Sequence, residues 1–266
     1  MAKASGGTLA SGTADSGGGV AAVKSIEKAF ALLESFRGRG RMLSLNELAV
    51  GAGLDKSSAQ RVTRTLRDLG YLHQDPATRR YYMAPRVLDL SYDFLRTHPL
   101  IERALPVVVE LQRVARERVD LVLSEHNTVV YVLRMQAKRE TFKPALFGRR
   151  VPMFCTAAGR AIMSGMAEDE AEALIAGSDR KAYTRKTLTE PHAIMAEVRK
   201  ARDLGYCLQA EEWLPAEMVL AVPVLDAHGK PYAALNVAVS TRDWTAEAMV
   251  EKFSAMLMSA AMELNG

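Results

Sequence analysis

Residues 44–83 read SLNELAVGAGLDKSSAQRVTRTLRDLGYLHQDPATRRYYM, and this stretch decides the fold of the first part of the chain. Ser44 is placed to cap a short helix, because Glu47 three residues later completes a capping box. A turn with two glycines interrupts that helix, and Asp55 is the expected cap of a second helix. Two short helices joined by a tight glycine-containing turn are typical of a helix-turn-helix.

The second helix has an apolar face and a basic face. Ala59, Val62, Leu66 and Leu69 recur at helical spacing and are predicted to be buried. The other face carries hydrogen-bond donors of the kinds that meet base edges and phosphates. The candidates for DNA contact on this helix are Lys56, Ser57, Ser58, Gln60, Arg61 and Arg64. Taken alone, such a helix is more often a solvated amphipathic helix, so the surrounding sequence has to decide.

A predicted hairpin follows the second helix and favours DNA binding. Residues 71–72 and 81–82 indicate two short strands, with a turn at residues 75–76 between them. Arg79 and Arg80 stand at the return of the hairpin, where a wing would contact the sugar–phosphate backbone. Helix, turn, helix and basic wing together predict a winged helix-turn-helix whose partner is a double-stranded DNA operator.

Basic charge is concentrated in the same part of the chain. Residues 22–86 hold twelve Lys and Arg against six Asp and Glu, a net charge of +6. Residues 87–266 hold 22 basic and 24 acidic side chains, a net charge of −2. A basic module on a mildly acidic body is what phosphate binding requires.

Length and composition limit the number of domains and the class of protein. At 266 residues the chain is long enough for two domains. No apolar run reaches the ~18 residues that a membrane helix needs, and the N-terminus lacks the apolar core of a secretory signal. Cys155 and Cys207 do not suggest a disulfide framework, so a cytoplasmic protein is expected. The histidines show no metal-ligand spacing and no glycine-rich phosphate loop is present, so neither a metal nor a cofactor is predicted.

Amphipathic helices are expected on both sides of the helix-turn-helix. Residues 1–20 are mostly Gly, Ser, Ala and Thr and predict a disordered tail before a DNA-binding domain at 21–83. A helix after the tail is expected to complete a three-helix core through Val23, Ile26, Ala29, Phe30, Leu33 and Phe36. A linker helix at 84–98 carries an apolar stripe from Val87 to Leu95. Because that stripe is broad for an exposed linker, we expect it to pack against a second copy of the chain, as a homodimer.

Beyond Pro99 the pattern changes to mixed strands and helices. Strands are expected at 119–124, 128–135, 206–210, 217–225 and 231–240. Helices are expected at 100–117, 156–166, 168–176, 191–204 and from 245, with a loop at 147–154. Strand pairs with helices at both ends predict an α+β domain at 99–266, in which helices pack on an antiparallel sheet.

These residues have the pattern of a known family. The matching run in the first domain is LNELAVGAGLDKSSAQRVTRTLRDLGYL. The runs in the second domain are GRRVPMFCTAAGRAIM, RDLGYCLQAEEW and LAVPVLDAHGKPYAALNVAVS. The chain resembles the IclR family of bacterial transcription regulators over nearly its whole length after the tail. RVPMFCTAAGRAIM and the NV of LNVAVS are most similar to the branch that controls aromatic-acid catabolism, the regulators of protocatechuate, 4-hydroxybenzoate or β-ketoadipate pathways.

The resemblance implies a winged helix-turn-helix, a linker helix and a GAF-like effector-binding domain. It also implies a homodimer, often a dimer of dimers, on a palindromic operator. One position departs from the family, which usually has glycine at the end of an E-E-x-x-x-G run. The corresponding residues here are Glu211-Glu212-Trp213-Leu214-Pro215-Ala216. We therefore expect a different turn before Glu217.

A small carboxylic acid, most simply an aromatic one, is the predicted effector. Thr156 is a candidate helix cap, and backbone N–H groups at a helix start attract anions. The resemblance places the effector carboxylate near this turn. It implies a pocket wall of Val151, Thr156, Ala157, Ala158, Gln209, Glu217, Val219, Asn236 and Ala238. Possible counter-charges for the acid, most of them expected at the surface, are Arg134, Lys143, Arg149 and Arg150.

The same residues also have purely structural interpretations, which the sequence does not exclude. The small residues at 157–159 would equally serve a helix packed tightly on a sheet. The amide of Asn236 needs partners if buried, and a backbone carbonyl would serve as well as a ligand oxygen.

Two other functions compete with a ligand-responsive regulator. One is a DNA-binding protein whose second domain only oligomerises it. The small residues Ala157 and Ala158 argue against it, because a site that binds nothing could be filled by large side chains. The other is an enzyme with Cys155 as nucleophile, which is disfavoured because no histidine lies nearby in the sequence. Cys155 is predicted to be a small buried residue instead.

Overall fold

The structure, a computed structural model, describes residues 22–137 and 147–266. The predicted tail at 1–20 and the candidate counter-charge Lys143 lie outside the described residues. The chain divides into two compact units, the first ending at Leu90 and the second beginning at Ser91. The division falls inside α4 (Val87–Thr97), the helix that the sequence predicts as a linker.

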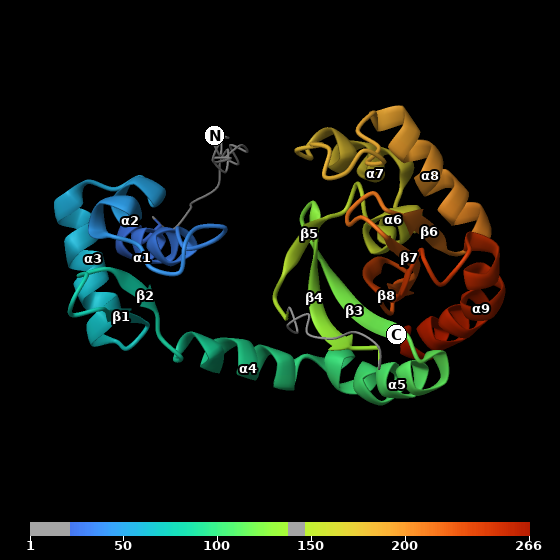
Figure 1. The fold of residues 1–266 in the computed structure, drawn as a ribbon, viewed down its shortest axis with the longest axis horizontal. Coiled ribbons are helices and arrows are strands. Elements are labelled where there is room, and N and C mark those ends of the chain that lie inside the picture. Colours follow the sequence, from blue (N-terminus) through green and yellow to red (C-terminus); the bar gives the residue numbers. More distant parts are fainter. Residues whose placement is uncertain (1–21, 138–146) are drawn as a thin grey trace. The chain divides into compact units, whose positions relative to one another are not determined.

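The N-terminal unit combines three helices with a two-stranded hairpin (Figure 1). Its elements are α1 (Lys24–Glu34), α2 (Leu45–Gly51), α3 (Lys56–Asp68), β1 (Leu72–Gln74) and β2 (Tyr81–Met83). The predicted capping box is present, because Glu47 N–H donates to Ser44 Oγ (3.3 Å) and Ser44 N–H donates to the Glu47 carboxylate (2.7 Å). The Asp55 carboxylate accepts from Ser58 N–H (2.8 Å) and caps α3. The two caps fix where α2 and α3 begin.

The apolar face of α1 is only partly buried, which corrects the prediction. Val23, Ile26 and Phe30 are more than half exposed, whereas Leu32 is fully buried. The predicted core residues Ala29, Leu33 and Phe36 are partly buried and pack against the same core. The apolar stripe of α1 is wider than the side that α2 and α3 cover, so one flank of it stays in water.

The buried face of α3 also differs from the prediction at one end. Leu69 is 51% exposed, and Thr63 is buried beside Ala59 and Leu66. Thr63 can be buried because its hydroxyl donates to the carbonyl oxygen of Ala59 (2.6 Å). Leu69 lies outside the core because the helix ends there, one residue before Gly70 turns the chain with a φ of +81°.

The linker helix α4 has no buried residue in the single chain. Leu88, Leu90, Tyr92 and Phe94 are between 47% and 66% exposed. Leu95 packs against the core of the second unit. The broad apolar surface is therefore uncovered, and its burial against a second copy stays a prediction.

The second unit is built on one antiparallel sheet of six strands in the order β5-β4-β3-β8-β7-β6 (Figure 1). The strands are β3 (Arg118–Glu125), β4 (Thr128–Met135), β5 (Arg150–Pro152), β6 (Cys207–Ala210), β7 (Glu217–Leu225) and β8 (Pro231–Ser240). β5 lies within the predicted loop at 147–154, so that prediction was wrong there. A strand of three residues is too short for an alternating pattern, and β5 is defined by its pairing with β4, where Val151 lies opposite Val129.

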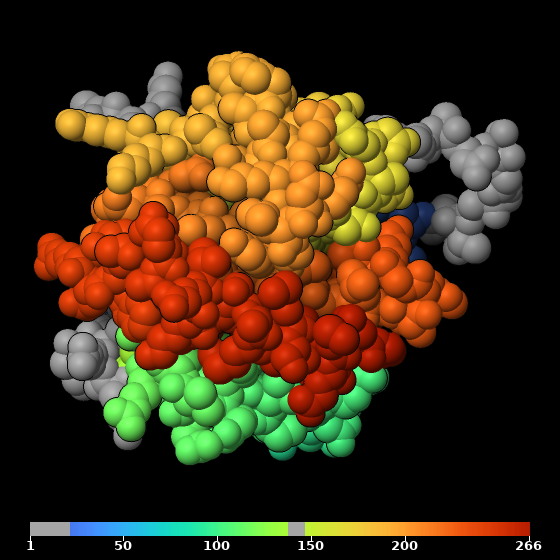
Figure 2. All heavy atoms as spheres, turned by 90° about the vertical axis from the view of Figure 1, so that its right-hand side faces the viewer, coloured from blue at the N-terminus to red at the C-terminus, as the bar shows by residue number. Residues whose placement is uncertain are grey.

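Helices cover both faces of this sheet, which confirms the α+β prediction. They are α5 (Pro99–Ala115), α6 (Ala157–Ser164), α7 (Glu168–Ala176), α8 (Pro191–Leu204) and α9 (Ala246–Leu264). α5 and α9 pack side by side on one face, as the green and red segments of Figure 2 show, and form a core with Leu121, Leu220 and Leu235. α6, α7 and α8 cover the other face, where α6 packs on β7 and β8. No helix in the described ranges is long and apolar enough to cross a membrane.

Candidate DNA-binding surface and effector site

The polar face of α3 is presented to solvent. Of the residues predicted to contact DNA from this helix, Lys56, Ser57, Gln60, Arg61 and Arg64 are exposed, whereas Ser58 is 5% exposed. The Arg61 guanidinium donates to the hydroxyls of Ser57 (3.1 Å) and Ser58 (3.2 Å), which directs it along the first turn of the helix. The Arg61 guanidinium is therefore held at the first turn of α3, whereas Arg64 lies 3.8 Å from the Asp68 carboxylate.

The two arginines of the wing have different surroundings. Arg79 is exposed and has a φ of +58°, in the left-handed region. Arg80 pairs with the Glu47 carboxylate (3.1 Å) and donates to the carbonyl oxygen of Met42 (3.0 Å). Arg80 thus connects the wing to the start of α2, whereas the guanidinium of Arg79 is exposed to solvent.

The predicted effector residues of the strands share one face of the sheet. Paired residues on neighbouring strands point to the same side, and Gln209 lies opposite Val219, which lies opposite Ala238. Ala221, the partner of Asn236, packs in the same cluster as α6. These side chains therefore face α6. Val151, Ala157, Ala158 and Val219 belong to or pack against one apolar cluster there.

The start of α6 is packed tightly rather than open. Thr156 Oγ accepts from Gly159 N–H (3.3 Å) and caps the helix as predicted, and every residue of α6 is buried. A Cβ on Gly159 would lie 2.3 Å from the Cα of Met153, so only glycine fits that position. At Gly159 the lack of a side chain permits this close packing, as the purely structural interpretation expects.

A buried network of charges, not predicted from the sequence, joins the effector residues Glu217 and Asn236. Arg118 donates to Asp120 Oδ2 (3.2 Å) and to Glu217 Oε2 (2.6 Å). Arg134 donates to Asp120 Oδ1 (2.7 Å), and its guanidinium lies 4.4 Å from the centre of the Tyr131 ring. Burial beside the Asp120 carboxylate raises the pKa of Tyr131 to about 12.

The network corrects one prediction about counter-charges. Arg134 is 8% exposed and paired, so it is not a surface residue. Arg149 stacks over the Trp213 ring at 5.6 Å, and Arg150 is exposed and donates to Thr128 (3.2 Å). A sequence signal for the network was Asp120, a carboxylate that stands between Val119 and Leu121 in the strand β3.

Asn236 lies at the inner end of this network. It is 2% exposed, and its Nδ2 donates to Asp120 Oδ2 (3.2 Å). Its Oδ1 is buried and has no hydrogen-bond partner among the described residues. A buried acceptor without a donor is costly, so this atom is suited to receive a hydrogen bond from a ligand.

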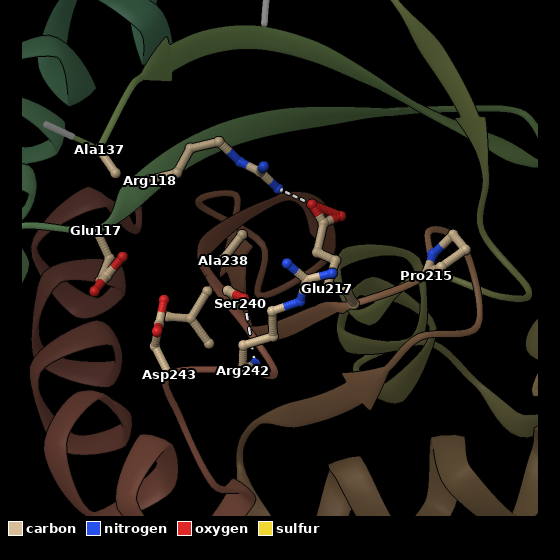
Figure 3. Close-up of a pocket in the computed structure, with 11 residues that line it drawn as sticks. Glu117, Arg118, Ala137, Pro215, Glu217, Ala238, Ser240, Arg242 and Asp243 are labelled. Carbon is tan, nitrogen blue, oxygen red and sulfur yellow. Dashed lines mark hydrogen bonds and ion pairs between the residues drawn. The ribbon is translucent and has the colours of Figure 1, made fainter. Parts of the chain in front are cut away.

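A cavity of about 380 Å³ opens beside the network, at the end of the sheet where β3 and β7 begin and β8 ends (Figure 3). Glu217 and Ala238 are the predicted effector residues on its wall, and the Arg118–Glu217 ion pair forms one side of it. Ala216, Arg242 and Asp243 are among the other residues that line it.

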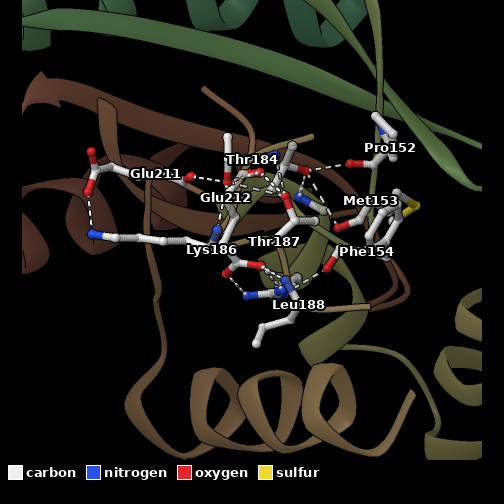
Figure 4. A network of polar contacts seen from close by, with 12 residues as sticks. Pro152, Met153, Phe154, Thr184, Lys186, Thr187, Leu188, Glu211 and Glu212 are labelled. Carbon is white, nitrogen blue, oxygen red and sulfur yellow. Dashed lines mark hydrogen bonds and ion pairs between the residues drawn. The ribbon is translucent and has the colours of Figure 1, made fainter. Parts of the chain in front are cut away.

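A second buried ion pair anchors the loops around α6 (Figure 4). Arg160 is fully buried and donates to both carboxylate oxygens of Glu212 (2.6 and 2.7 Å) and to the carbonyl oxygen of Phe154 (2.8 Å). Burial alone would lower the pKa of Arg160, but the bonds to Glu212 hold it above its ordinary value. Glu212 also accepts from Leu188 N–H (3.0 Å), so one carboxylate joins α6 to the segment before α8.

The turn before β7 contains an alanine in a left-handed conformation. Ala216 has a φ of +58°, in the left-handed region that glycine adopts readily. Its N–H donates to the Glu211 carboxylate (2.9 Å), and the Glu211 N–H donates to the carbonyl oxygen of Glu217 (2.7 Å). These bonds hold alanine in a conformation that favours glycine, and a turn different from that of the family stays a prediction.

Two protein-family models match this chain. A model of the C-terminal domain of the bacterial transcriptional regulator IclR matches residues 92–265, and a model of the IclR helix-turn-helix domain matches residues 25–76. The chain belongs to the IclR family of bacterial transcriptional regulators. The match at residues 92–265 begins inside α4, and the predicted domain boundaries stay a prediction.

Curated relatives of this IclR-family protein regulate several kinds of operon. The Pca regulon regulatory protein of Pseudomonas putida is 27% identical over 90% of this chain and 82% of its own. The glycerol operon regulatory protein of Streptomyces coelicolor is 31% identical over 81% and 84%. The p-hydroxybenzoate hydroxylase transcriptional activator of Acinetobacter baylyi is 26% identical over 91% and 90%. These relatives are transcription regulators rather than enzymes, and two of them are consistent with the aromatic branch.

Solved structures share the fold. A transcriptional regulator from Rhodococcus sp. RHA1 superposes with a TM-score of 0.78 and 26% identity, over 91% of this chain and 97% of its own. An IclR homologue from Microbacterium hydrocarbonoxydans, solved in complex with 4-hydroxybenzoate, has a TM-score of 0.71 and 21% identity, over 90% and 97%.

Proposed function

We propose that this IclR-family protein is a ligand-responsive regulator that acts in the cytoplasm. It binds a palindromic operator as a dimer or a dimer of dimers and senses a small organic acid, most simply an aromatic one. The exposed basic side chains on the polar face of α3 carry the DNA-binding part of the proposal. A two-fold dimer of such heads reads two half-sites, which a palindrome supplies.

DNA binding is tested on duplexes selected from a random library with the wild-type protein. Arg61→Ala and Arg64→Ala lie one turn apart on the polar face, and each is expected to weaken binding by ~1–3 kcal/mol if it contacts a base edge. Arg113→Ala removes the same charge from α5, where the side chain pairs only locally with Glu110, and it should leave binding unchanged. If the Arg61/Arg64 double variant bound these duplexes with wild-type affinity, α3 would not be the helix that recognises the DNA.

The proposal of a dimer is supported by the uncovered apolar side of α4. Leu88, Leu90 and Tyr92 expose more than half of their surface in the single chain, and contiguous apolar surface of this kind marks an interface. Light scattering is expected to show a dimer or tetramer at micromolar concentration. A monomer that still binds DNA would contradict this part of the proposal.

The effector part of the proposal rests on the unpartnered oxygen of Asn236 and on the cavity beside Ala238. The 4-hydroxybenzoate complex of the Microbacterium homologue supports an aromatic acid as the class to test first. A thermal-shift screen of small carboxylic acids should find a ligand. Asn236→Ala should weaken that ligand by ~1–3 kcal/mol, the range for an unmet buried polar contact.

A second variant separates this function from the alternative of a domain that only oligomerises the protein. Ala238→Phe adds a ring to the cavity wall and should abolish the ligand response while DNA binding persists. The tight packing of α6 is the observation that favours the alternative. If no acid in the screen shifts the melting temperature or alters DNA binding, the alternative is preferred.

A further inference from the structure

The exposed arginine of the wing has a backbone conformation that is costly for its residue type. Arg79 has a φ of +58°, in the left-handed region that disfavours residues with a Cβ. Residues in such conformations persist where their surroundings hold them, and they cluster at functional sites. Two bonds act on this backbone, because Arg79 N–H donates to the carbonyl oxygen of Asp75 (2.9 Å) and the Arg79 carbonyl oxygen accepts from Gln74 Nε2 (3.0 Å). The direction in which the Arg79 side chain leaves the wing therefore depends on the side chain of Gln74.

The same glutamine is bound to α3. Gln74 ends β1, where its side chain lies on the same face of the strand as that of Leu72. Leu72 is fully buried in the core to which α3 contributes. The Gln74 side chain accordingly reaches the last turn of α3, where its Oε1 accepts from Arg67 Nη1 (3.0 Å). Both ends of the amide are used, and the two hydrogen bonds form a chain from α3 through Gln74 to the backbone of Arg79.

Other bonds close the turn of the hairpin. Asp75 Oδ1 accepts from Thr78 N–H (2.6 Å) and from Thr78 Oγ1 (2.8 Å), and Asp75 N–H donates to the carbonyl oxygen of Arg80 (2.8 Å). These bonds use neither the amide of Gln74 nor the guanidinium of Arg67. Arg80 is itself held by Glu47 (3.1 Å), so it does not share the exposed position of Arg79. What the amide of Gln74 adds to the wing is thus the placement of Arg79 relative to α3.

We propose that Gln74 is a positioning residue for DNA binding. It fixes the guanidinium of Arg79 relative to α3, so that the helix and the wing contact one duplex together. This inference rests on the proposed DNA binding and adds a residue that itself need not touch DNA. Arg67 is the fixed end of the chain on α3 rather than a side chain that reads bases. Because Gln74 is uncharged, loss of its amide leaves the charge of the DNA-binding unit unchanged and alters only where the Arg79 cation lies.

The test is the salt dependence of DNA binding by the full chain, measured on one duplex selected with the wild-type protein. Gln74→Met keeps the length of the side chain but has no amide. Each phosphate contact that is lost lowers the slope of log K against log salt concentration by about 0.9. If Arg79 no longer reaches its phosphate, the affinity of the wild type should fall roughly 3.5-fold more than that of the variant between 50 and 200 mM salt. At 100 mM salt the variant should bind about three- to tenfold more weakly. A purely structural role of Gln74 would lower the melting temperature and leave the slope unchanged.

Three further variants complete the test. Tyr82→Phe is the matched control, because it exchanges one neutral side chain for another in the same hairpin, opposite His73, and it should leave the slope unchanged. Arg79→Ala should lower the slope by about one, and adding Gln74→Met to it should change binding no further, because the cation that Gln74 positions is then absent. Gln74→Asn keeps the amide but is one carbon shorter, so it cannot span both bonds. It should behave like Gln74→Met and replaces that variant if it does not fold.

The outcomes separate this inference from the proposed function. A lowered slope for Arg79→Ala with an unchanged slope for the Gln74 variants would overturn the positioning role and leave the wing contact intact. A further loss when Gln74→Met is added to Arg79→Ala would also overturn it, because Gln74 would then act on another contact. If neither Gln74 variant folds, the amide serves stability and the inference is wrong. If Arg79→Ala leaves the slope unchanged, the predicted contact of Arg79 with phosphate is wrong and the positioning role with it, whereas the test of Arg61 and Arg64 on α3 is unaffected.

Discussion

Replacing Glu212 by glutamine should destabilise the effector domain strongly, because it leaves Arg160 as a buried charge without a counter-charge. Arg160 is fully buried, and both of its terminal nitrogens bond the Glu212 carboxylate at 2.6 and 2.7 Å. Glutamine keeps the shape but can accept only one of these bonds. Removing one partner of a buried ion pair costs about 3–5 kcal/mol, and the remaining bond places the expected loss near the lower end, at about 3 kcal/mol.

Urea unfolding followed by tryptophan fluorescence measures this loss in the right domain. The chain has two tryptophans, Trp213 and Trp244, and both lie in the second unit. With a urea slope of about 1–3 kcal/mol per molar, the midpoint should fall by roughly 1 M or more. Glu168→Gln is the matched control, because its pair with Arg199 is about half exposed and should contribute under about 1 kcal/mol. If the two variants unfold at the same urea concentration, the reasoning about the buried pair is refuted.

Three more predictions concern single positions. Ala216→Gly should raise the free energy of unfolding by up to about 1 kcal/mol in urea titration, because it removes the strain of a left-handed alanine; a loss would show that the strain is already relieved. Gly159→Ala should lower the free energy of unfolding by at least about 1–3 kcal/mol, because the new Cβ meets Met153. Gly40 has open space around it, so Gly40→Ala should change this free energy little. Burial raises the pKa of the Cys155 and Cys207 thiols to about 12, so both should resist iodoacetamide at neutral pH until the protein is unfolded; rapid alkylation of the native protein would return Cys155 to the candidates for a reactive group.

The sequence is most informative where a local rule decides the structure. The capping box of Ser44 and the cap of Asp55 depend on residues three apart, so the chain alone shows them. The long strands β7 and β8 and the helix α8 have the predicted bounds, because their periodic patterns extend over nine or more residues.

The predictions fail where partners far apart in the chain decide the structure. Arg118 and Glu217 are 99 residues apart, and no local pattern indicates that they meet. The strand β5 and the exposed flank of α1 likewise depend on what a neighbouring element covers. Seven of the nine effector residues named from the resemblance are buried side chains, but their grouping with a charged network required the sheet register.

The register also sets an order of assembly during synthesis. The N-terminal unit closes through contacts that are local in the chain, such as the β1–β2 hairpin with Leu72 opposite Met83. The effector sheet cannot close in this way, because β3 lies next to β8 and Arg118 pairs with Ala238, 120 residues later. Local contacts form quickly, and long loops delay the pairing of distant strands. The DNA-binding module can therefore fold before β8 has been synthesised. Until then β3 has no partner on the side where β8 will pair, and this edge can bind chaperones or pair incorrectly.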